Sequence, residues 1–311
     1  MAIETTTEKI LRLKKERNAV ILAHNYVLPE IQDIADFAGD SLGLSKQAAA
    51  TDADVIVFCG VHFMAETAKI LSPQKTVLIP DMTAGCPMAD MITAEQLADF
   101  KKQYPDALVV CYVNSTAEVK ALSDYCCTSG NAIELVSKLP DDKGIIFVPD
   151  RYLGSYVKER TGKNIILWPG YCPTHARISA DHLKELKQNN PDATIMAHPE
   201  CPELTREVAD VLLSTGQMLA YAKSSEQIKF IVATEPGILH ALKKQNPEKE
   251  FINGCVATCM NMKKMTLDKL IYSLENMVYE VDVPEETAKK ARVSLYRMLE
   301  VMPETSSKKS N

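Results

Sequence analysis

The chain has 311 residues, of which 46% are hydrophobic, and a formal net charge of −6. This composition can fill large buried cores, and its many Ala, Leu, Ile and Val residues favour α/β architecture. The negative charge without a long basic run argues against nucleic acid as a partner, and no apolar run approaches the roughly 18–20 residues that a membrane span needs. We therefore expect a cytoplasmic protein, whose nine cysteines bind metal, take part in catalysis or lie buried rather than form disulfides.

Short apolar segments rich in Val and Ile alternate with helical patterns along the chain. In chain order they read NAVILAH, DVIVFCG, TVLIP, ALVVCYV, GIIFVP, NIILWP, ATIMAH and KFIVAT. Each segment predicts a buried strand, and the helical pattern between most pairs is typical of a crossover connection. The alternation therefore predicts parallel sheets covered by helices.

The strand–helix pattern repeats three times, because residues 18–41, 106–129 and 192–215 can be overlaid with shifts of 88 and 86 residues. Each segment contains a strand, a polar tip, a helix, and a Ser or Thr that is expected to open another helix. The overlay makes three sets of positions equivalent: His24 with Tyr112 and His198, Tyr26 with Asn114 and Glu200, and Ser41 with Ser129 and Thr215.

Three cysteines occupy the same place in the second half of each repeat. Cys86, Cys172 and Cys259 are separated by 86 and 87 residues, and each is followed seven residues later by a hydroxyl that can cap a helix, namely Thr93, Ser179 and Thr266. Cys255 does not fit this register. We therefore expect Cys259, and not Cys255, to be the equivalent of the other two.

These repeats predict three homologous α/β units and a C-terminal helical extension. The predicted boundaries are residues 16–102, 103–188 and 189–272 for the units and 273–303 for the extension. Because functional loops lie at the carboxyl ends of parallel strands, three units packed around a pseudo-threefold axis would bring the three cysteines together. Three thiolates can hold an iron–sulfur cube with one open iron, which acts as a Lewis acid, and a three-cysteine zinc site is chemically possible too.

Several motifs together resemble the quinolinate synthase family over about residues 18–300. The motifs are LAHNY, GDSL, FMAETAKIL, YVNSTAE, HPEC, STGQM and CMNMKKMT, in this order. The resemblance implies three Rossmann-like units around a pseudo-threefold axis and one [4Fe–4S] cluster per chain, held by Cys86, Cys172 and Cys259. It also implies a transferase of NAD biosynthesis that condenses iminoaspartate with dihydroxyacetone phosphate to quinolinate, with loss of phosphate and two waters. An L-aspartate oxidase or aspartate dehydrogenase would supply the imine.

The implied substrates are anions, so an acidic protein must bind them with positioned donors such as helix N-termini. We predict substrate-binding roles for seven residues: His24, Ser41, Phe63, Asn114, Ser129, His198 and Thr215. The condensation moves protons at several steps and therefore needs acid–base groups. We predict catalytic roles for four residues: Tyr26, Tyr112, His175 and Glu200.

Two hypotheses from other functional classes stay open at this point. An electron carrier or sensor could use the same cluster, although a carrier usually closes its cluster with four protein ligands. A three-domain zinc protein, or a ligand-binding module without metal, is the other alternative. The colour and metal content of the purified protein would distinguish these hypotheses.

Overall fold

Three four-stranded parallel sheets form the framework of the protein, in a computed structural model that describes residues 4–301. In every sheet the first strand of the unit lies between the second and the third, and the fourth lies outside the third. The first sheet contains β1 (Ala19–His24), β2 (Phe37–Gly39), β3 (Val55–Cys59) and β4 (Thr76–Leu78). The second contains β5 (Leu108–Tyr112), β6 (Tyr125–Cys127), β7 (Ile145–Val148) and β8 (Ile165–Leu167). The third contains β9 (Thr194–Ala197), β10 (Val211–Leu212), β11 (Lys229–Ala233) and β12 (Glu250–Asn253).

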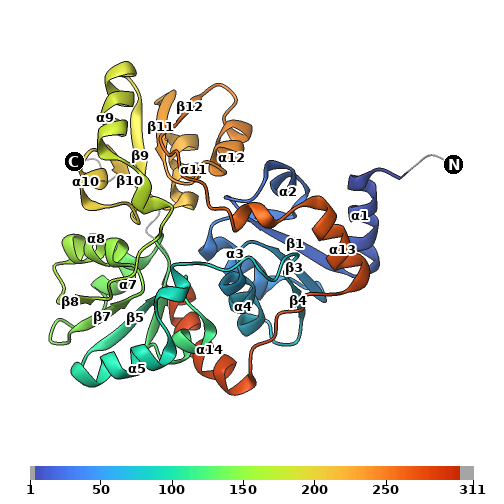
Figure 1. Ribbon diagram of the computed structural model, residues 1–311, viewed down its shortest axis with the longest axis horizontal. Helices are drawn as coiled ribbons and strands as arrows, with labels where there is room; N and C mark the ends of the chain where they lie inside the picture. Colours follow the sequence, from blue (N-terminus) through green and yellow to red (C-terminus); the bar gives the residue numbers. More distant parts are fainter. Residues whose placement is uncertain (1–3, 302–311) are drawn as a thin grey trace.

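Helices connect the strands in the same order in each unit, which confirms the predicted α/β fold with three repeats. The first unit has α1 (Thr6–Glu16), α2 (Pro29–Ile34), α3 (Ser41–Ala50) and α4 (His62–Leu71). The second has α5 (Ala94–Gln103), α6 (Ala117–Ala121), α7 (Ala132–Ser137) and α8 (Arg151–Thr161). The third has α9 (Ala180–Asn189), α10 (Glu203–Glu207), α11 (Thr215–Ser224) and α12 (Ile238–Gln245). Figure 1 shows the three units arranged around a common centre.

The same carboxylate contact fixes the second strand of each unit beside the first. Just before the second strand stands an aspartate whose Oδ2 accepts a hydrogen bond of 2.8 Å from a first-strand backbone N–H. The pairs are Asp36 with Ile21, Asp124 with Val109, and Asp210 with Ile195. Because the geometry recurs three times, the repeat is present in the hydrogen bonding as well as in the strand order.

Hydroxyl caps begin the helices that follow the three equivalent cysteines. Thr93, Ser179 and Thr266 accept a hydrogen bond from the third backbone N–H of α5, α9 and α13 (Leu267–Asn276), as the sequence predicts. Thr5 caps α1 in the same way. The helix that follows each equivalent cysteine therefore starts from the same local signal.

Two C-terminal helices pack back on the body of the protein. Helix α13 lies beside α1 of the first unit (Figure 1), and α14 (Glu285–Glu300) packs on α6 and β6 of the second unit. The C-terminal helices therefore contact the first and second units. The predicted unit boundaries, which place α5 at the end of the first unit and α9 at the end of the second, stay predictions. Residues 302–303 of the predicted extension lie outside the described residues.

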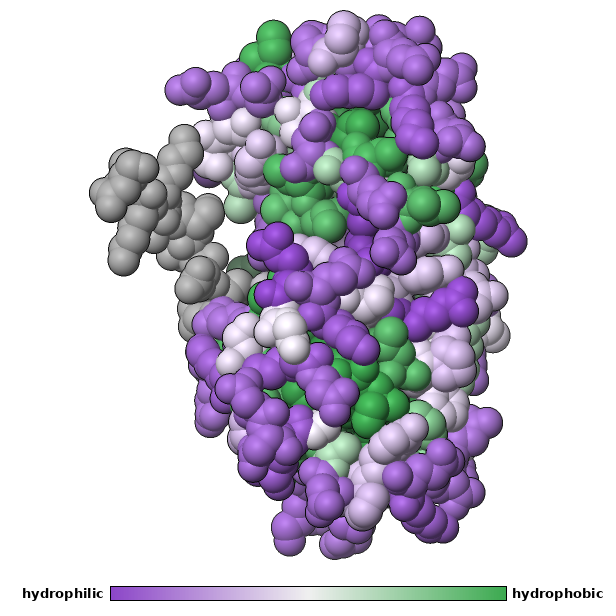
Figure 2. Space-filling model, turned by 90° about the vertical axis from the view of Figure 1, so that its left-hand side faces the viewer, coloured by the Kyte–Doolittle hydropathy of each residue, from purple (hydrophilic) through white to green (hydrophobic). Residues whose placement is uncertain are grey.

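Hydrophilic side chains cover most of the face shown in Figure 2, and hydrophobic side chains gather there in separate patches. Within residues 4–301, none of the helices combines the length and the apolar character that a bilayer crossing requires.

Candidate functional site

One cavity, at the junction of the three units, is lined by every residue for which the sequence predicts a role in the site. These residues are His24, Tyr26, Ser41, Phe63, Cys86, Tyr112, Asn114, Ser129, Cys172, His175, His198, Glu200, Thr215 and Cys259. His24 and Tyr112 are the last residues of β1 and β5, and His198 directly follows β9. The carboxyl ends of the three first strands therefore converge on this cavity, as expected for parallel sheets.

The three equivalent cysteines enter the cavity through the same local structure. Each lies three residues before the first residue of a short 3₁₀ helix: η1 (Ala89–Met91), η2 (His175–Arg177) or η3 (Met262–Lys264). The backbone N–H of that first residue donates to the cysteine sulfur in each case. Burial raises the pKa of the Cys86 thiol to about 12 and also raises those of Cys172 and Cys259. A bound cation is what would stabilise three such buried thiolates together.

Cys255 has a different environment, as its place outside the repeat register predicts. It is buried and does not line the cavity. Its thiol donates to the backbone oxygen of Ala257 at 3.2 Å, and burial raises its pKa to about 11. The two cysteines of the NGCVATC segment are therefore not a pair facing one site.

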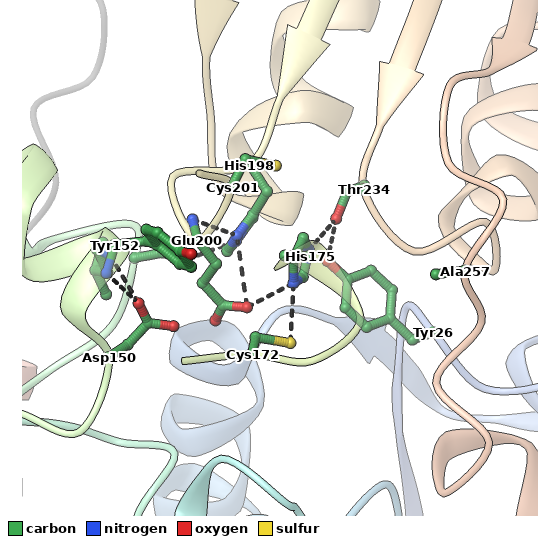
Figure 3. A network of polar contacts seen from close by, with 12 residues as sticks. Tyr26, Asp150, Tyr152, Cys172, His175, His198, Glu200, Cys201, Thr234 and Ala257 are labelled. Carbon is green, nitrogen blue, oxygen red and sulfur yellow. Dashed lines mark hydrogen bonds and ion pairs between the residues drawn. The ribbon is translucent and has the colours of Figure 1, made fainter. Parts of the chain in front are cut away.

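A chain of hydrogen bonds crosses the cavity wall and joins all three units (Figure 3). Glu200 accepts from the hydroxyl of Tyr112 at 2.5 Å through Oε1, and its Oε2 lies 2.7 Å from Nδ1 of His175. Nε2 of His175 lies 2.8 Å from the hydroxyl of Thr234, which lies 2.5 Å from the hydroxyl of Tyr26. Protons can therefore be shared between an acid, an imidazole and two phenols without leaving the site.

Within this hydrogen-bonded network, Glu200 carries the negative charge. Burial raises the pKa of Glu200, but His175 and the hydrogen bonds donated by His175 and Tyr112 outweigh burial and hold that pKa well below its ordinary value. Burial, followed by the nearby Glu200 charge, raises the pKa of Tyr26 and of Tyr112 well above the ordinary value. The hydrogen-bonded network therefore contains one carboxylate and two neutral phenols.

The equivalent histidines His24 and His198 also share their geometry. Nδ1 of His24 accepts from the backbone N–H of Tyr26 at 3.2 Å, and Nδ1 of His198 accepts from the backbone N–H of Glu200 at 3.3 Å. Burial lowers both pKa values to about 3, so both rings are neutral and carry their proton on Nε2. Nε2 of His198 lies 3.1 Å from the hydroxyl of Ser129. The pair thus supplies two neutral N–H donors.

Of the three hydroxyls that were expected to open helices, two do so. Ser41 and Thr215 are the first residues of α3 and α11, whose capping residues are Asp40 and Ser214. The prediction that Ser129 opens a helix is wrong, because it lies two residues before the N-cap position of α7. The equivalent stretch of the second unit turns through Thr128–Asn131 first, where the Asn131 side chain bonds the Thr128 backbone.

Two further residues line the cavity where the sequence placed them. Phe63 is the second residue of α4, so it stands at a helix start as expected. Asn114 follows β5, and its buried Oδ1 has no hydrogen-bond partner among the described residues. A buried acceptor without a partner is costly in a folded protein, so Oδ1 is suited to accept from a bound ligand.

Three residues of the site were missed from the sequence: Asp40, Thr234 and Glu235. Asp40 and Glu235 line the cavity, and Thr234 joins Tyr26 to His175. Asp40 and its neighbour Ser41 belong to the GDS sequence that the repeat overlay had already selected. Thr234 and Glu235 follow the third strand of their unit, which lies beyond the overlaid residues 192–215.

Cys172, His175 and Glu200 also form a compact group of potential metal ligands. One ligand atom from each lies within 4.8 Å of the others. Nδ1 of His175 is central to the group, 3.2 Å from the Cys172 sulfur and 2.7 Å from the Glu200 carboxylate. The cavity could therefore bind a metal through this group as well as through the three cysteines.

Comparison with known proteins gives a consistent result over nearly the whole chain. Residues 8–300 match the family model described as Quinolinate synthetase A protein. A quinolinate synthase of Dehalococcoides mccartyi is 58% identical over 301 residues, which cover 96% of this chain and 99% of that protein. A quinolinate synthase of Thermus thermophilus is 53% identical over 303 residues, 96% of this chain and 98% of that one. That of Geobacter metallireducens is 52% identical over 302 residues, 97% and 99% of the two chains.

Proposed function

Since the chain belongs to the Quinolinate synthetase A protein family, we propose that it is a quinolinate synthase that condenses iminoaspartate with dihydroxyacetone phosphate. The products are quinolinate, phosphate and two waters. One observation carries the proposal: three register-equivalent cysteines, one from each unit, line the same cavity as the acid–base chain centred on Glu200.

We propose that Cys86, Cys172 and Cys259 hold one [4Fe–4S] cluster per chain. One cysteine from each unit lines the cavity, and no fourth cysteine lines it among residues 4–301. Three thiolates can bind three irons of such a cluster and leave the fourth iron open. When bound, the cluster supplies an open iron that acts as a Lewis acid on a substrate hydroxyl or carboxylate.

In this proposal Glu200 is the general base, and its neighbours carry the protons. The low pKa of Glu200 keeps it ionised, and the Tyr112 hydroxyl at 2.5 Å can donate to it or to substrate. His175 bonds Glu200 on one side and Thr234 on the other, so it can pass a proton towards Tyr26. Both tyrosines act as neutral phenols that donate hydrogen bonds to developing negative charge.

The remaining cavity residues bind and orient the two anionic substrates. His24 and His198 offer neutral Nε2–H donors, and Asn114 offers its unpaired oxygen to a donor of the substrate. Ser41 and Thr215 add hydroxyls and backbone N–H groups at the starts of two ten-residue helices, where the helix dipole favours anions. Ser129 reaches the same cavity from its loop, and Phe63 covers the substrate with an apolar ring.

A single metal ion on Cys172, His175 and Glu200 is a second candidate, favoured by the closeness of their ligand atoms. It predicts about one zinc per chain in colourless protein. The cluster predicts brown protein with about four irons and four sulfides. Metal and sulfide analysis of anaerobically purified protein separates the two.

The proposed reaction needs a source of iminoaspartate, which an L-aspartate oxidase or aspartate dehydrogenase would supply. All nine cysteines are free thiols, as in a reducing compartment. A cytoplasmic location is therefore part of the proposal.

The decisive experiment is an anaerobic assay in which an aspartate oxidase generates the imine beside dihydroxyacetone phosphate. Cluster-loaded protein should produce quinolinate, identified by mass spectrometry, and the reaction should fail without either substrate. Cluster-loaded protein that forms no quinolinate would refute the proposed function.

A further inference from the structure

Glu235, which the proposed reaction does not use, is a fully buried carboxylate that contacts the backbone of a proposed cluster ligand. It lies two residues beyond the end of β11. Its Oε1 accepts from the backbone N–H of Cys259 at 3.3 Å, and its Oε2 accepts from the backbone N–H of Gly237 at 2.7 Å. Both oxygens are thus hydrogen-bonded, and the carboxylate is fixed beside the Cys259 loop.

Lys263 completes the arrangement around this carboxylate. Its Nζ lies 2.9 Å from Oε1 of Glu235 and donates to the backbone oxygen of Tyr26 at 2.5 Å. The ammonium therefore joins the third unit to the first. A Cβ added to Gly237 would lie 2.7 Å from this Nζ and 2.8 Å from Oε2 of Glu235, so the close approach requires glycine.

The second unit has an acid at the equivalent position. Val61, Asp150 and Glu235 each lie two residues beyond the third strand of their unit. The backbone N–H of Cys172 donates a hydrogen bond to the Asp150 carboxyl. In the same way, the backbone N–H of Cys259 donates to Glu235. The first unit has the apolar Val61 instead. An acid therefore faces the backbone of the ligand cysteine in two of the three units, and only Glu235 is paired with a cation.

Buried charges beside a redox centre change its reduction potential in a direction set by their sign. Reduction adds negative charge to a cluster, so a nearby carboxylate opposes it and a nearby ammonium favours it. The effect is large where the groups are screened from water. The Glu235 side chain is 0% exposed and that of Lys263 is 18% exposed, so neither charge is fully screened.

We propose that Glu235 and Lys263 are positioning residues that fix the Cys259 loop and set the reduction potential of the cluster with opposite signs. The inference rests on the proposed function, because that function supplies the cluster. The proposed reaction assigns neither residue an acid–base or substrate-binding role. Their role is to hold a ligand cysteine and to keep two opposite charges close to the metal centre.

The test compares two neutral variants, Glu235→Gln and Lys263→Gln. In Glu235→Gln the amide oxygen can keep the hydrogen bond from the Cys259 backbone N–H, whereas the shorter Gln at position 263 removes both the charge and the contact with the Tyr26 backbone. The holoproteins are titrated anaerobically with reductant while the reduced cluster is followed by electron paramagnetic resonance. Lys244→Gln is the matched control, because the Lys244 side chain is 61% exposed and its charge is screened.

We expect the cluster midpoint to become more positive in E235Q, more negative in K263Q, and intermediate in the double variant, with K244Q unchanged. General loosening of the Cys259 loop would shift the midpoint potentials of both single variants in the same direction, and that result would overturn the inference. Unchanged midpoint potentials in cluster-containing variants would also overturn it. Wild-type protein that binds no cluster would instead overturn the proposed function, and this inference with it.

Discussion

Replacing Glu200 with Gln tests the proposed acid–base chain most directly. The carboxylate accepts from the Tyr112 hydroxyl and from His175 Nδ1, at 2.5 and 2.7 Å. A Gln side chain can keep its oxygen towards His175, which still donates. Its NH₂ group then faces Tyr112, whose hydroxyl can rotate and accept. The His175 contact survives in this arrangement and the Tyr112 contact reverses its direction, so the negative charge, the basic oxygen and the hydrogen bond donated by Tyr112 are lost.

The expected loss in kcat is therefore that of a general base, about 10²–10⁴-fold, while the fold stays intact. This corresponds to about 3–5 kcal/mol of transition-state stabilisation. Stability should fall by about 1–3 kcal/mol, because the buried Tyr112 hydroxyl loses the acceptor of its own proton.

The assay is the anaerobic rate of quinolinate formation, normalised to cluster iron, together with urea unfolding of the same preparations. Tyr112→Phe is the companion variant, because it removes one hydrogen bond to Glu200 and leaves the carboxylate in place. It should retain more activity than E200Q. An E200Q enzyme within about threefold of the wild-type rate would show that Glu200 is not the base.

Two further predictions concern the cysteines and the buried histidines. Cys259→Ala should lose the cluster iron whereas Cys255→Ala should keep it, as measured by iron and sulfide content, and the reverse result would exclude the repeat-based assignment. His24 and His198, with pKa values of about 3 in the folded state and about 6.5 when unfolded, bind protons more readily in the unfolded chain. Stability must therefore fall as pH decreases from 6.5 towards 3, by about 2 kcal/mol per histidine at pH 5. Urea unfolding at pH 7 and pH 5 should show this loss, and a smaller one in His24→Gln and His198→Gln; equal losses in all three proteins would contradict it.

The repeat made much of the fold and the site predictable, because short local sequence patterns specify it. Apolar strand segments, capping hydroxyls such as Thr93 and the period of the cysteines are all set by neighbouring residues. These signals were sufficient to separate Cys259 from Cys255. They also placed His24, Tyr112 and His198 together, because equivalent strand ends must meet once three sheets pack around one centre.

The contacts between units could not be predicted in the same way. Thr234 matters because its hydroxyl contacts Tyr26 of the first unit and His175 of the second. No local sequence pattern predicts a contact between residues of different units. Ser129 was misplaced because the overlay assumed that all three helices begin at the same residue. The actual turn depends on Asn131, whose side chain bonds the Thr128 backbone.

The distribution of chemistry among the repeats follows from what the site must bind. The proposed metal centre takes the same donor from each unit, and a cysteine stands at the equivalent position in all three. The proposed substrates are not symmetric, and the residues at the tips of the first strands differ among the units. At one repeat position the first unit has the phenol Tyr26 and the third has the carboxylate Glu200. At another, the second unit has the phenol Tyr112 where the first and third have the histidines His24 and His198. These differing positions are joined by hydrogen bonds, because Tyr112 and His175 both donate to Glu200.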